Sequence, residues 1–242
     1  MNPLELRRAR DITALFGDAL RTYGRNAGTF LLVSASIVVP AELAVSGVGL
    51  EQLTASYDES PPIAETIVPT AVSFLVVAPL ITATCIYALR DVAAGGRPRP
   101  GRTLLAGLEA FTPIFFAVLL AALGIALGLL LLIVPGVYVA VRWYFVPQAV
   151  VLERARGPTA LTGSGRVVDG FWWRTAGILV LANLATTIPS LALLGPFAAI
   201  AREADRAVWS LVGRMATEVV TTPFIALLST LLYYDLLARR TS

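Results

Sequence analysis

The chain has 242 residues, of which 57% are hydrophobic and only 14% are charged, and its mean hydropathy is +0.75. A water-soluble domain does not tolerate this composition, so the sequence indicates an integral membrane protein. All 19 basic residues are Arg, His is absent, and the single Cys, Cys85, excludes an internal disulfide. These absences exclude Ser-His-Asp and Cys-His hydrolases, His-ligated metal sites and Lys Schiff bases.

Six apolar stretches are long enough to cross a bilayer, which takes about 20 mostly apolar residues. They cover residues 27–48, 66–89, 112–134, 136–152, 175–197 and 215–237. The predicted fold is an all-α polytopic helical bundle, with about six transmembrane helices in three hairpins, and 1–242 form a single transmembrane domain. The fourth stretch is the weakest, because it is short, follows Pro135-Gly136 and contains Arg142 and Pro147. Five full crossings with a re-entrant segment are the alternative.

The distribution of Arg predicts the orientation. Residues 1–26 are interrupted by Arg and lack the pattern of a cleaved signal peptide, so the first span is expected to remain as an anchor. Fifteen Arg lie in 1–26, 90–102, 153–174 and the last residues, whereas only three lie in 198–214. The positive-inside rule therefore places both termini in the cytoplasm. The all-Arg, Ala-rich composition favours a bacterial genome, so the expected location is a bacterial cytoplasmic membrane.

A short amphipathic helix is predicted before each odd-numbered span. Apolar residues recur at helical spacing in 12–23, 104–111 and 161–172. Helices of this kind are expected to lie in the plane of the lipid headgroups. Ala14-Leu15-Phe16-Gly17 and Ala160-Leu161-Thr162-Gly163 align, which suggests three repeat units at 1–90, 103–152 and 158–238. Chance similarity among residues common in membrane helices is the alternative.

A family pattern covers the middle of the chain and its end. It consists of Pro135-Gly136-Val137-Tyr138-Val139-Ala140-Val141-Arg142-Trp143, Val150-Val151-Leu152-Glu153, Gly157, Ala160-Leu161, Ser164, Gly170, Trp173-Arg174, Leu231-Leu232-Tyr233-Tyr234-Asp235-Leu236 and Arg239-Arg240. This pattern resembles the membrane domain family of glycerophosphoryl diester phosphodiesterases, including its stand-alone bacterial members. Thr162-Gly163 departs from it, because members often have a basic pair there. The resemblance implies a fold and a membrane location. It does not imply hydrolysis, because the diester chemistry of that family belongs to a separate soluble domain.

Arg142 is the most informative candidate site residue. A charge in the middle of a span costs about 2.5–3.5 kcal/mol and usually faces a partner or a cavity. In the predicted orientation Glu42 and Glu218 lie at a comparable depth. The three residues could form an outer-leaflet pocket for an anionic headgroup or an ion, because a guanidinium suits phosphate. A structural ion pair, or an Arg that reaches the interface from a tilted helix, is the alternative.

A second candidate cluster lies at the cytoplasmic interface, where all of its members except Arg174 stand at the exits of even-numbered spans. It comprises Glu153, Asp235, Arg90, Asp91 and Arg174. Charges at an interface cost little, so ion pairs that cap helix ends explain these residues. A carboxylate site for a divalent cation is the sharper alternative, and it requires the hairpin ends to converge.

The leading functional interpretation is a non-enzymatic membrane protein that binds lipid or a protein partner. The expected partners are membrane lipids, anionic ones above all, or another protein chain, including a second copy of this one. No cofactor is implied, and the basic loops lack a motif for nucleic acid. A small transporter or channel that uses the Arg142 pocket is one alternative. A membrane enzyme that relies only on carboxylates and Arg is another.

Overall fold

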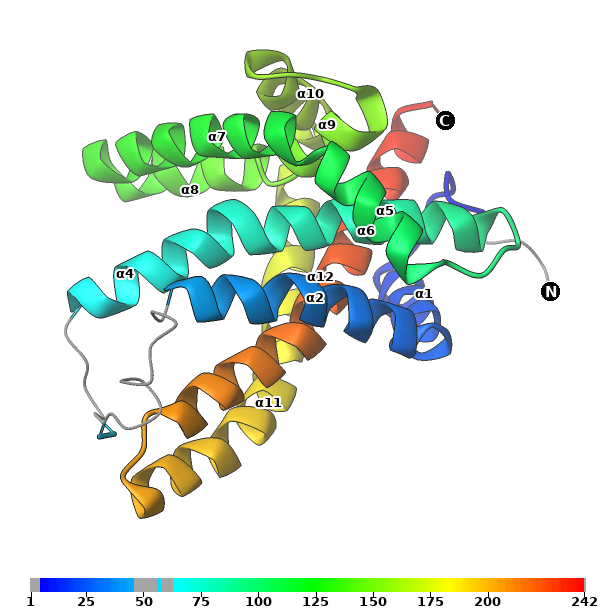
Figure 1. Ribbon diagram of the computed structural model, residues 1–242. Helices are drawn as coiled ribbons and strands as arrows, with labels where there is room; N and C mark the ends of the chain where they lie inside the picture. The colour runs from blue at the N-terminus through cyan, green and yellow to red at the C-terminus, as the bar shows by residue number, and fades with distance from the viewer. Residues whose placement is uncertain (1–4, 46–55, 58–62, 242) are drawn as a thin grey trace.

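The structure is a computed structural model that describes residues 5–45, 56–57 and 63–241. The described residues form helices and no β-strand (Figure 1). The elements are α1 (Ile12–Arg25), α2 (Ala27–Val45), α4 (Ile63–Val72), the π-helical segment η1 (Ser73–Val77), α5 (Ala78–Ala93), α6 (Pro100–Glu109), α7 (Phe111–Leu131), α8 (Ile133–Arg142), α9 (Val146–Glu153), α10 (Pro158–Val168), α11 (Trp172–Ala204) and α12 (Val208–Thr241).

Five helices among the described residues are long and apolar enough to cross a membrane. They are Ala27–Val45, Ile67–Ala93, Phe111–Leu131, Trp172–Ala204 and Val208–Arg240. The second of these runs through α4, η1 and α5 without a loop. The predicted all-α polytopic helical bundle is confirmed, and the protein is a multi-pass membrane protein.

The fourth predicted span, 136–152, is not one continuous helix. It is divided between α8 and α9, which are separated by a turn at residues 143–145. Pro147 lies at the start of α9, and a proline has no backbone N–H with which to continue the helix from α8. At about 1.5 Å per residue, neither the 10 residues of α8 nor the 8 residues of α9 could cross about 30 Å of hydrocarbon alone.

Contacts between the two ends of the described chain limit how it can cross the bilayer. The backbone N–H of Arg10 donates to Asp235 near the end of α12, at 2.6 Å, so both ends lie on one face of the molecule. We call this end the terminal face, and the opposite end, where α11 connects to α12, the loop face. Two ends on one face require an even number of crossings. The five long helices are therefore not sufficient, and α8 and α9 together lead the chain back from the tip of α7.

The three predicted amphipathic segments form the separate helices α1, α6 and α10, which precede α2, α7 and α11. α1 begins where the carboxylate of Asp11 accepts the backbone N–H of Ala14 at 2.7 Å. Pro100 and Pro158 occupy the first turns of α6 and α10, where a missing N–H costs nothing. The position of these helices in the headgroup plane and the three repeat units stay predictions.

Helices α7 and α8 form a tight hairpin (Figure 1). A Cβ atom added to Gly136 would lie 2.6 Å from the backbone nitrogen of Leu129, so only glycine permits this approach. At the tip, Leu130, Ile133 and Val134 have exposed fractions of 83%, 74% and 80%. The sequence has no charged residue in 112–141. The outward side chains of this hairpin are therefore suited to lipid.

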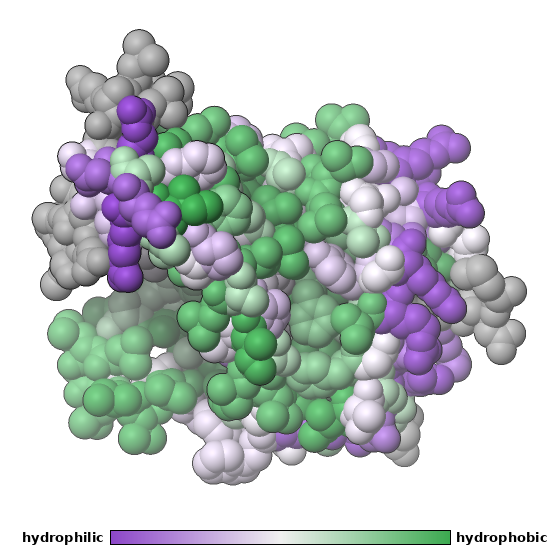
Figure 2. Space-filling view, turned by 90° about the horizontal axis from the view of Figure 1, so that it is seen from below, coloured by the Kyte–Doolittle hydropathy of each residue, from purple (hydrophilic) through white to green (hydrophobic). Residues whose placement is uncertain are grey.

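Helix α12 forms the centre of the bundle. It packs against α11, α2, α5 and α1, and every residue from Ala226 to Leu236 is buried. Figure 2 shows a broad hydrophobic surface between two groups of charged residues at opposite ends of the molecule. A hydrophobic surface bounded by charge at both ends is what a bilayer-spanning bundle presents to lipid and water.

Candidate functional site

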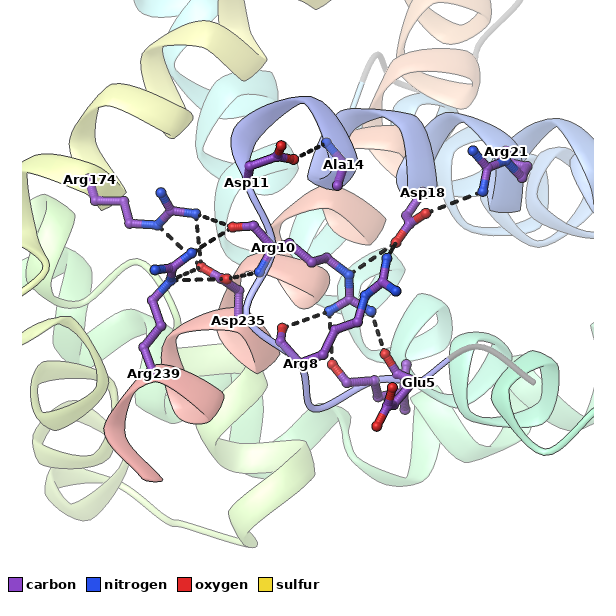
Figure 3. Close-up of polar contacts among 11 residues, drawn as sticks. Glu5, Arg8, Arg10, Asp11, Ala14, Asp18, Arg21, Arg174, Asp235 and Arg239 are labelled. Atoms are coloured by element: carbon purple, nitrogen blue, oxygen red, sulfur yellow. Dashed lines mark hydrogen bonds and ion pairs between the residues drawn. The ribbon is translucent and has the colours of Figure 1, made fainter. Parts of the chain in front are cut away.

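Asp235 is the centre of an ionic cluster on the terminal face (Figure 3). Its side chain is fully buried at the end of α12. Oδ2 lies 3.2 Å from Nη2 of Arg174, and Nε of Arg239 donates to both carboxylate oxygens at 3.1 Å. With the N–H of Arg10 also bound, the carboxylate of Asp235 is compensated by two guanidinium groups and a backbone donor, as a buried charge requires.

Arg10 takes part in this cluster through its backbone. Its carbonyl accepts hydrogen bonds from Nη2 of Arg174 and from Nη2 of Arg239, both at 2.7 Å. The peptide groups on both sides of Arg10 are therefore fixed by α11 and α12. This arrangement holds the segment before α1 against the ends of two long helices.

The side chain of Arg10 forms a second ionic centre with Asp18 of α1. Its Nε lies 3.0 Å from Oδ2 of Asp18, and only 1% of the Arg10 side chain is exposed. The more exposed Arg8 and Arg21 lie 3.3 and 3.4 Å from the same carboxylate. Five guanidinium groups thus surround two carboxylates, Asp18 and Asp235, and this face is positively charged.

Of the residues predicted to converge on this face, Arg174 and Asp235 are in contact, and the others have different neighbours. Glu153 accepts a hydrogen bond from the hydroxyl of Tyr233. Asp91 forms an ion pair with Arg102 at 2.5 Å, and Arg90 is exposed at the end of α5. In the part of the chain that the structure describes, no group of three or more His, Cys, Asp and Glu side chains could hold a metal ion. The three carboxylates therefore do not form the cation site considered above.

Arg142 does not pair with Glu42 or Glu218, so the predicted pairing is wrong. Its partner is Asp169, at the end of α10, with Nη1 to Oδ1 at 2.6 Å and Nη2 to Oδ2 at 3.0 Å. Arg142 ends α8, and the link between α10 and α11 lies against that end. A Cβ at Gly165 would lie 2.8 Å from Nε of Arg142, so glycine makes room for the guanidinium. Arg142 thus fastens α10 to the broken end of α8.

Ser164 supports the same junction. Its hydroxyl donates to the carbonyl of Arg142 at 2.9 Å and accepts the N–H of Phe145 at 3.1 Å. These backbone groups would lack helical partners because the helix breaks at residues 143–145. One serine therefore satisfies both sides of the break.

Glu42 and Glu218 lie toward the loop face, beside Arg214. Oε2 of Glu42 is 3.2 Å from Nη2 of Arg214, which stands one turn before Glu218 on α12. Glu218 accepts a hydrogen bond from the hydroxyl of Ser73 in η1. The basic residue beside these two acidic residues is thus Arg214, and not Arg142 as predicted.

An apolar groove of about 880 Å³ lies between α1, α11 and α12. Its walls include Phe16 and Leu20 of α1, Leu181 and Ala185 of α11, and Phe224 of α12. The groove has no charged side chain among its described lining residues. A volume of this size is within the range of about 300–1,000 Å³ that is common for pockets that bind small molecules.

The groove and the ionic cluster lie along the same helix faces. Leu181 and Ala185 follow Arg174 by 7 and 11 residues, which at 3.6 residues per turn places all three on one side of α11. Asp235 likewise follows Phe224 by 11 residues on α12. On α1, the groove residue Ile12 comes two residues after Arg10. The groove therefore leads toward the positively charged terminal face.

Tyr23 closes the groove on the side of α1. Its hydroxyl donates to the carbonyl of Val220 at 2.9 Å, and its ring stacks on Phe30. Burial raises the pKa of the Tyr23 phenol above its ordinary value, and the nearby Cys85 thiol raises it further. The phenol therefore stays protonated and keeps its hydrogen bond at neutral pH.

Sequence reasoning missed the contributions of Arg10, Asp18, Asp169 and the Arg214 pairing. All four are ordinary charged residues, and the sequence offers no sign of their partners. The one available signal was that Asp18 lies on a predicted amphipathic helix. An acidic residue at a solvent-exposed position of such a helix would give the same signal.

No curated protein and no solved structure matches the chain. The comparison with protein-family models gives one result, and it does not link the chain to the membrane domain of glycerophosphoryl diester phosphodiesterases. Residues 101–236, which include α7–α11 and most of α6 and α12, match the model described as a domain of unknown function, DUF7847. Because this match covers more than half of the chain, the protein belongs to the DUF7847 family.

Proposed function

We propose that the protein is a non-enzymatic membrane protein that binds an anionic phospholipid. One acyl chain lies in the groove between α1, α11 and α12, and the headgroup lies at the positively charged terminal face. The observation that carries the proposal is the apolar groove itself, whose helix faces continue into the cluster around Asp235.

The surroundings of the groove favour an acyl chain as its occupant. Leu181 and Leu184 line the groove and are also exposed, with 43% and 60% of their surface accessible. Residues that line the groove and are also exposed mark a side on which the groove opens to the outside of the molecule. A chain can therefore enter sideways from the bilayer without passing through water.

The charge at the terminal face favours an anionic headgroup. Arg8 and Arg21 are largely exposed, with 49% and 62% of their side chains accessible, and both share the single carboxylate of Asp18. A guanidinium near the membrane surface contributes about 1 kcal/mol of attraction to anionic lipid. If the terminal face is cytoplasmic, as the Arg distribution predicts, it meets the leaflet that carries the anionic lipids.

The composition supports binding rather than catalysis, because the sequence lacks His and Lys. The resemblance to the membrane domain of diester phosphodiesterases fits this proposal as well, since that domain is separate from the catalytic one. The proposal also includes the binding of a protein partner, which is either another protein or a second copy of this chain.

The test blocks the groove without straining the backbone. A Cβ at Gly17, which lines the groove, meets no atom within 4 Å. Gly17→Trp therefore places in the groove a ring system that buries about 150–250 Å². Gly24→Trp is the matched control, because Gly24 lies on the same helix, is exposed, has equally open space and does not line the groove.

The measurement is native mass spectrometry of protein purified in mild detergent and exposed to equal amounts of phosphatidylglycerol and phosphatidylcholine. We expect the unchanged protein and Gly24→Trp to retain phosphatidylglycerol and Gly17→Trp to lose most of it. Replacing Arg8 and Arg21 by Gln should reduce the preference for the anionic lipid about fivefold per residue, at about 1 kcal/mol each. Equal lipid retention in the two Trp variants would refute the groove, and an unchanged lipid preference in the Gln variants would refute the headgroup site.

A further inference from the structure

Asn183 is a polar residue on the outside of the membrane bundle. It lies on α11, 9 residues after Arg174 of the terminal face. At about 1.5 Å per residue this distance is about 14 Å, so Asn183 stands near the middle of a hydrocarbon layer that is about 30 Å thick. The residue is exposed, and its neighbours Val180 and Leu184 have exposed fractions of 58% and 60%. An amide in this position meets lipid, which offers it no hydrogen bond.

Hydrogen bonds within the chain satisfy only part of this amide. Nδ2 of Asn183 donates one hydrogen to the carbonyl of Leu179 at 2.8 Å. A primary amide has a second hydrogen on the nitrogen and two lone pairs on the oxygen. No hydrogen bond among the described residues uses that second hydrogen or Oδ1 of Asn183. The side chain therefore has one donor and one acceptor left for another molecule.

Neighbouring helices of the same chain do not supply a partner for this amide. Asn183 lines an inner cavity of about 450 Å³ among α5, α7, α9, α11 and α12, which shares no lining residue with the apolar groove. Two polar residues on its other walls, Gln148 of α9 and Ser229 of α12, bond to each other, since Nε2 of Gln148 donates to the Ser229 hydroxyl at 3.0 Å. The cavity thus leaves space beside Asn183 that a side chain of another molecule can fill.

The residues around Asn183 permit another helix to approach. Ala176, Val180 and Thr187 lie on the same side of α11, because they are 7, 3 and 4 residues away from Asn183. Their side chains are short, and short side chains are common where membrane helices pack closely. The hydroxyl of Thr187 donates to the carbonyl of Asn183 at 2.9 Å, so it needs no partner in lipid. We call Ala176, Val180, Asn183 and Thr187 the Asn183 face.

A second copy of the chain matches this face, because an amide is complementary to itself. Every copy carries the same distribution of Arg, so all copies insert into the membrane in the same orientation. A symmetric pair then has its two-fold axis along the membrane normal, and equivalent residues meet at the same depth. The remaining N–H of each Asn183 can donate to Oδ1 of the other. Phospholipids do not offer this match, because they present only acyl chains at this depth.

We infer that the protein forms a symmetric dimer in which the Asn183 faces of two α11 helices pack together and the two amides form reciprocal hydrogen bonds. In parallel coiled coils a single Asn in the interface fixes the register and the number of helices in the same way. The inference rests on the part of the proposed function that includes a second copy as a partner, and it names the face that binds this copy.

The dimer leaves the phospholipid groove open. Leu181 and Ala185 line the groove, and each stands 2 residues from Asn183. Residues that are 2 apart on a helix point to different sides. The groove and the Asn183 face are therefore separate surfaces of α11, and a substitution on one of them leaves the other intact.

The test is disulfide cross-linking of the full chain in lipid vesicles, in a Cys85→Ala background that removes the only native thiol. Thr187→Cys places a thiol on the Asn183 face, one turn from the amide. Ile188→Cys is the matched control, because Ile188 is the next residue, has an exposed fraction of 76% and points about 100° away from Thr187. Vesicles with a low protein content are treated with copper phenanthroline, and the dimer is quantified on non-reducing gels. We expect Thr187→Cys to cross-link and Ile188→Cys to remain monomeric.

A second substitution tests the amide itself. In the Thr187→Cys protein, Asn183→Leu should lower the ratio of dimer to monomer about threefold to twentyfold, which is the range for one hydrogen bond between membrane helices. Asn183→Gln keeps an amide and should retain most of the dimer. Equal cross-linking at the two cysteine positions would overturn the interface, and an unchanged ratio after Asn183→Leu would overturn the role of the amide.

The same variants separate this inference from the lipid groove. Native mass spectrometry of Asn183→Leu should show phosphatidylglycerol retained as in the unchanged protein, and Gly17→Trp should lose the lipid without losing the dimer. Failure of the groove would therefore appear in the lipid measurement alone. Failure of the dimer would appear in the cross-linking alone. Loss of lipid in Asn183→Leu would contradict the separation of the two surfaces.

Discussion

Replacing Asp235 by Asn tests whether the ionic cluster holds the terminal face together. The substitution keeps the size of the side chain and removes its charge. Asp235 is fully buried and compensates Arg174 and Arg239, so both guanidiniums would lose their counter-charge. Breaking a buried ion pair in this way costs about 3–5 kcal/mol. For a chain of this size, 1 kcal/mol corresponds to a shift of about 2–4 °C in the melting temperature. We therefore expect Asp235→Asn to lower the melting temperature by about 6–20 °C.

The matched control is Asp91→Asn, which removes the same charge from another Asp-Arg pair. In that pair 68% of the Arg102 side chain is exposed, so the pair contributes about 0–1 kcal/mol. Melting temperatures are measured by circular dichroism in detergent micelles. Trypsin cleavage after Arg10 provides a second measurement, because its side chain is buried and its backbone is fixed by the cluster. Cleavage there should accelerate only in Asp235→Asn. Equal shifts in the two variants, or unchanged cleavage, would refute this account of the cluster.

Two further predictions concern the hairpin and the topology. Gly136→Ala should lower the free energy of unfolding by about 1–3 kcal/mol, because its Cβ would clash with the backbone of Leu129. Gly28→Ala should leave the free energy of unfolding unchanged in the same denaturation assay, because its Cβ meets no atom within 4 Å. In a Cys85→Ala background, Arg8→Cys should react with an impermeant maleimide from one side of a vesicle membrane, and Glu203→Cys only from the other. Reaction of both cysteines from the same side would contradict an even number of crossings.

The sequence predicted the helical elements well, because their signals are local. A run of about 20 apolar residues identifies a membrane helix wherever its neighbours lie, and helical spacing of apolar residues identified α1, α6 and α10 in the same way. The division of the fourth span also had a local sign in Pro147, which lies at the start of α9, whereas Pro135-Gly136 lies within α8. Its exact form, two helices joined through Ser164, depends on a residue from a different element.

The ion pairs show the limit of this reasoning. Depth along a predicted span placed Arg142 near Glu42 and Glu218, but depth says nothing about which helices are neighbours. The link between α10 and α11 brings Asp169 to Arg142, and α12 brings Arg214 to Glu42. The hydrogen bond between Gln148 and Ser229 was likewise invisible, because the two residues are 81 positions apart and lie on different helices.

The sequence by itself determined that this chain is a helical membrane protein, where its helices run and which residues are charged. Those properties follow from the transfer of single segments between water and lipid, which does not require a neighbour. Only the tertiary structure decided which charges meet, where the apolar groove and the inner cavity lie, and that both ends of the described chain share one face. Those properties arise from contacts between helices far apart in the chain, and many arrangements of the same helices satisfy the hydrophobic pattern equally well.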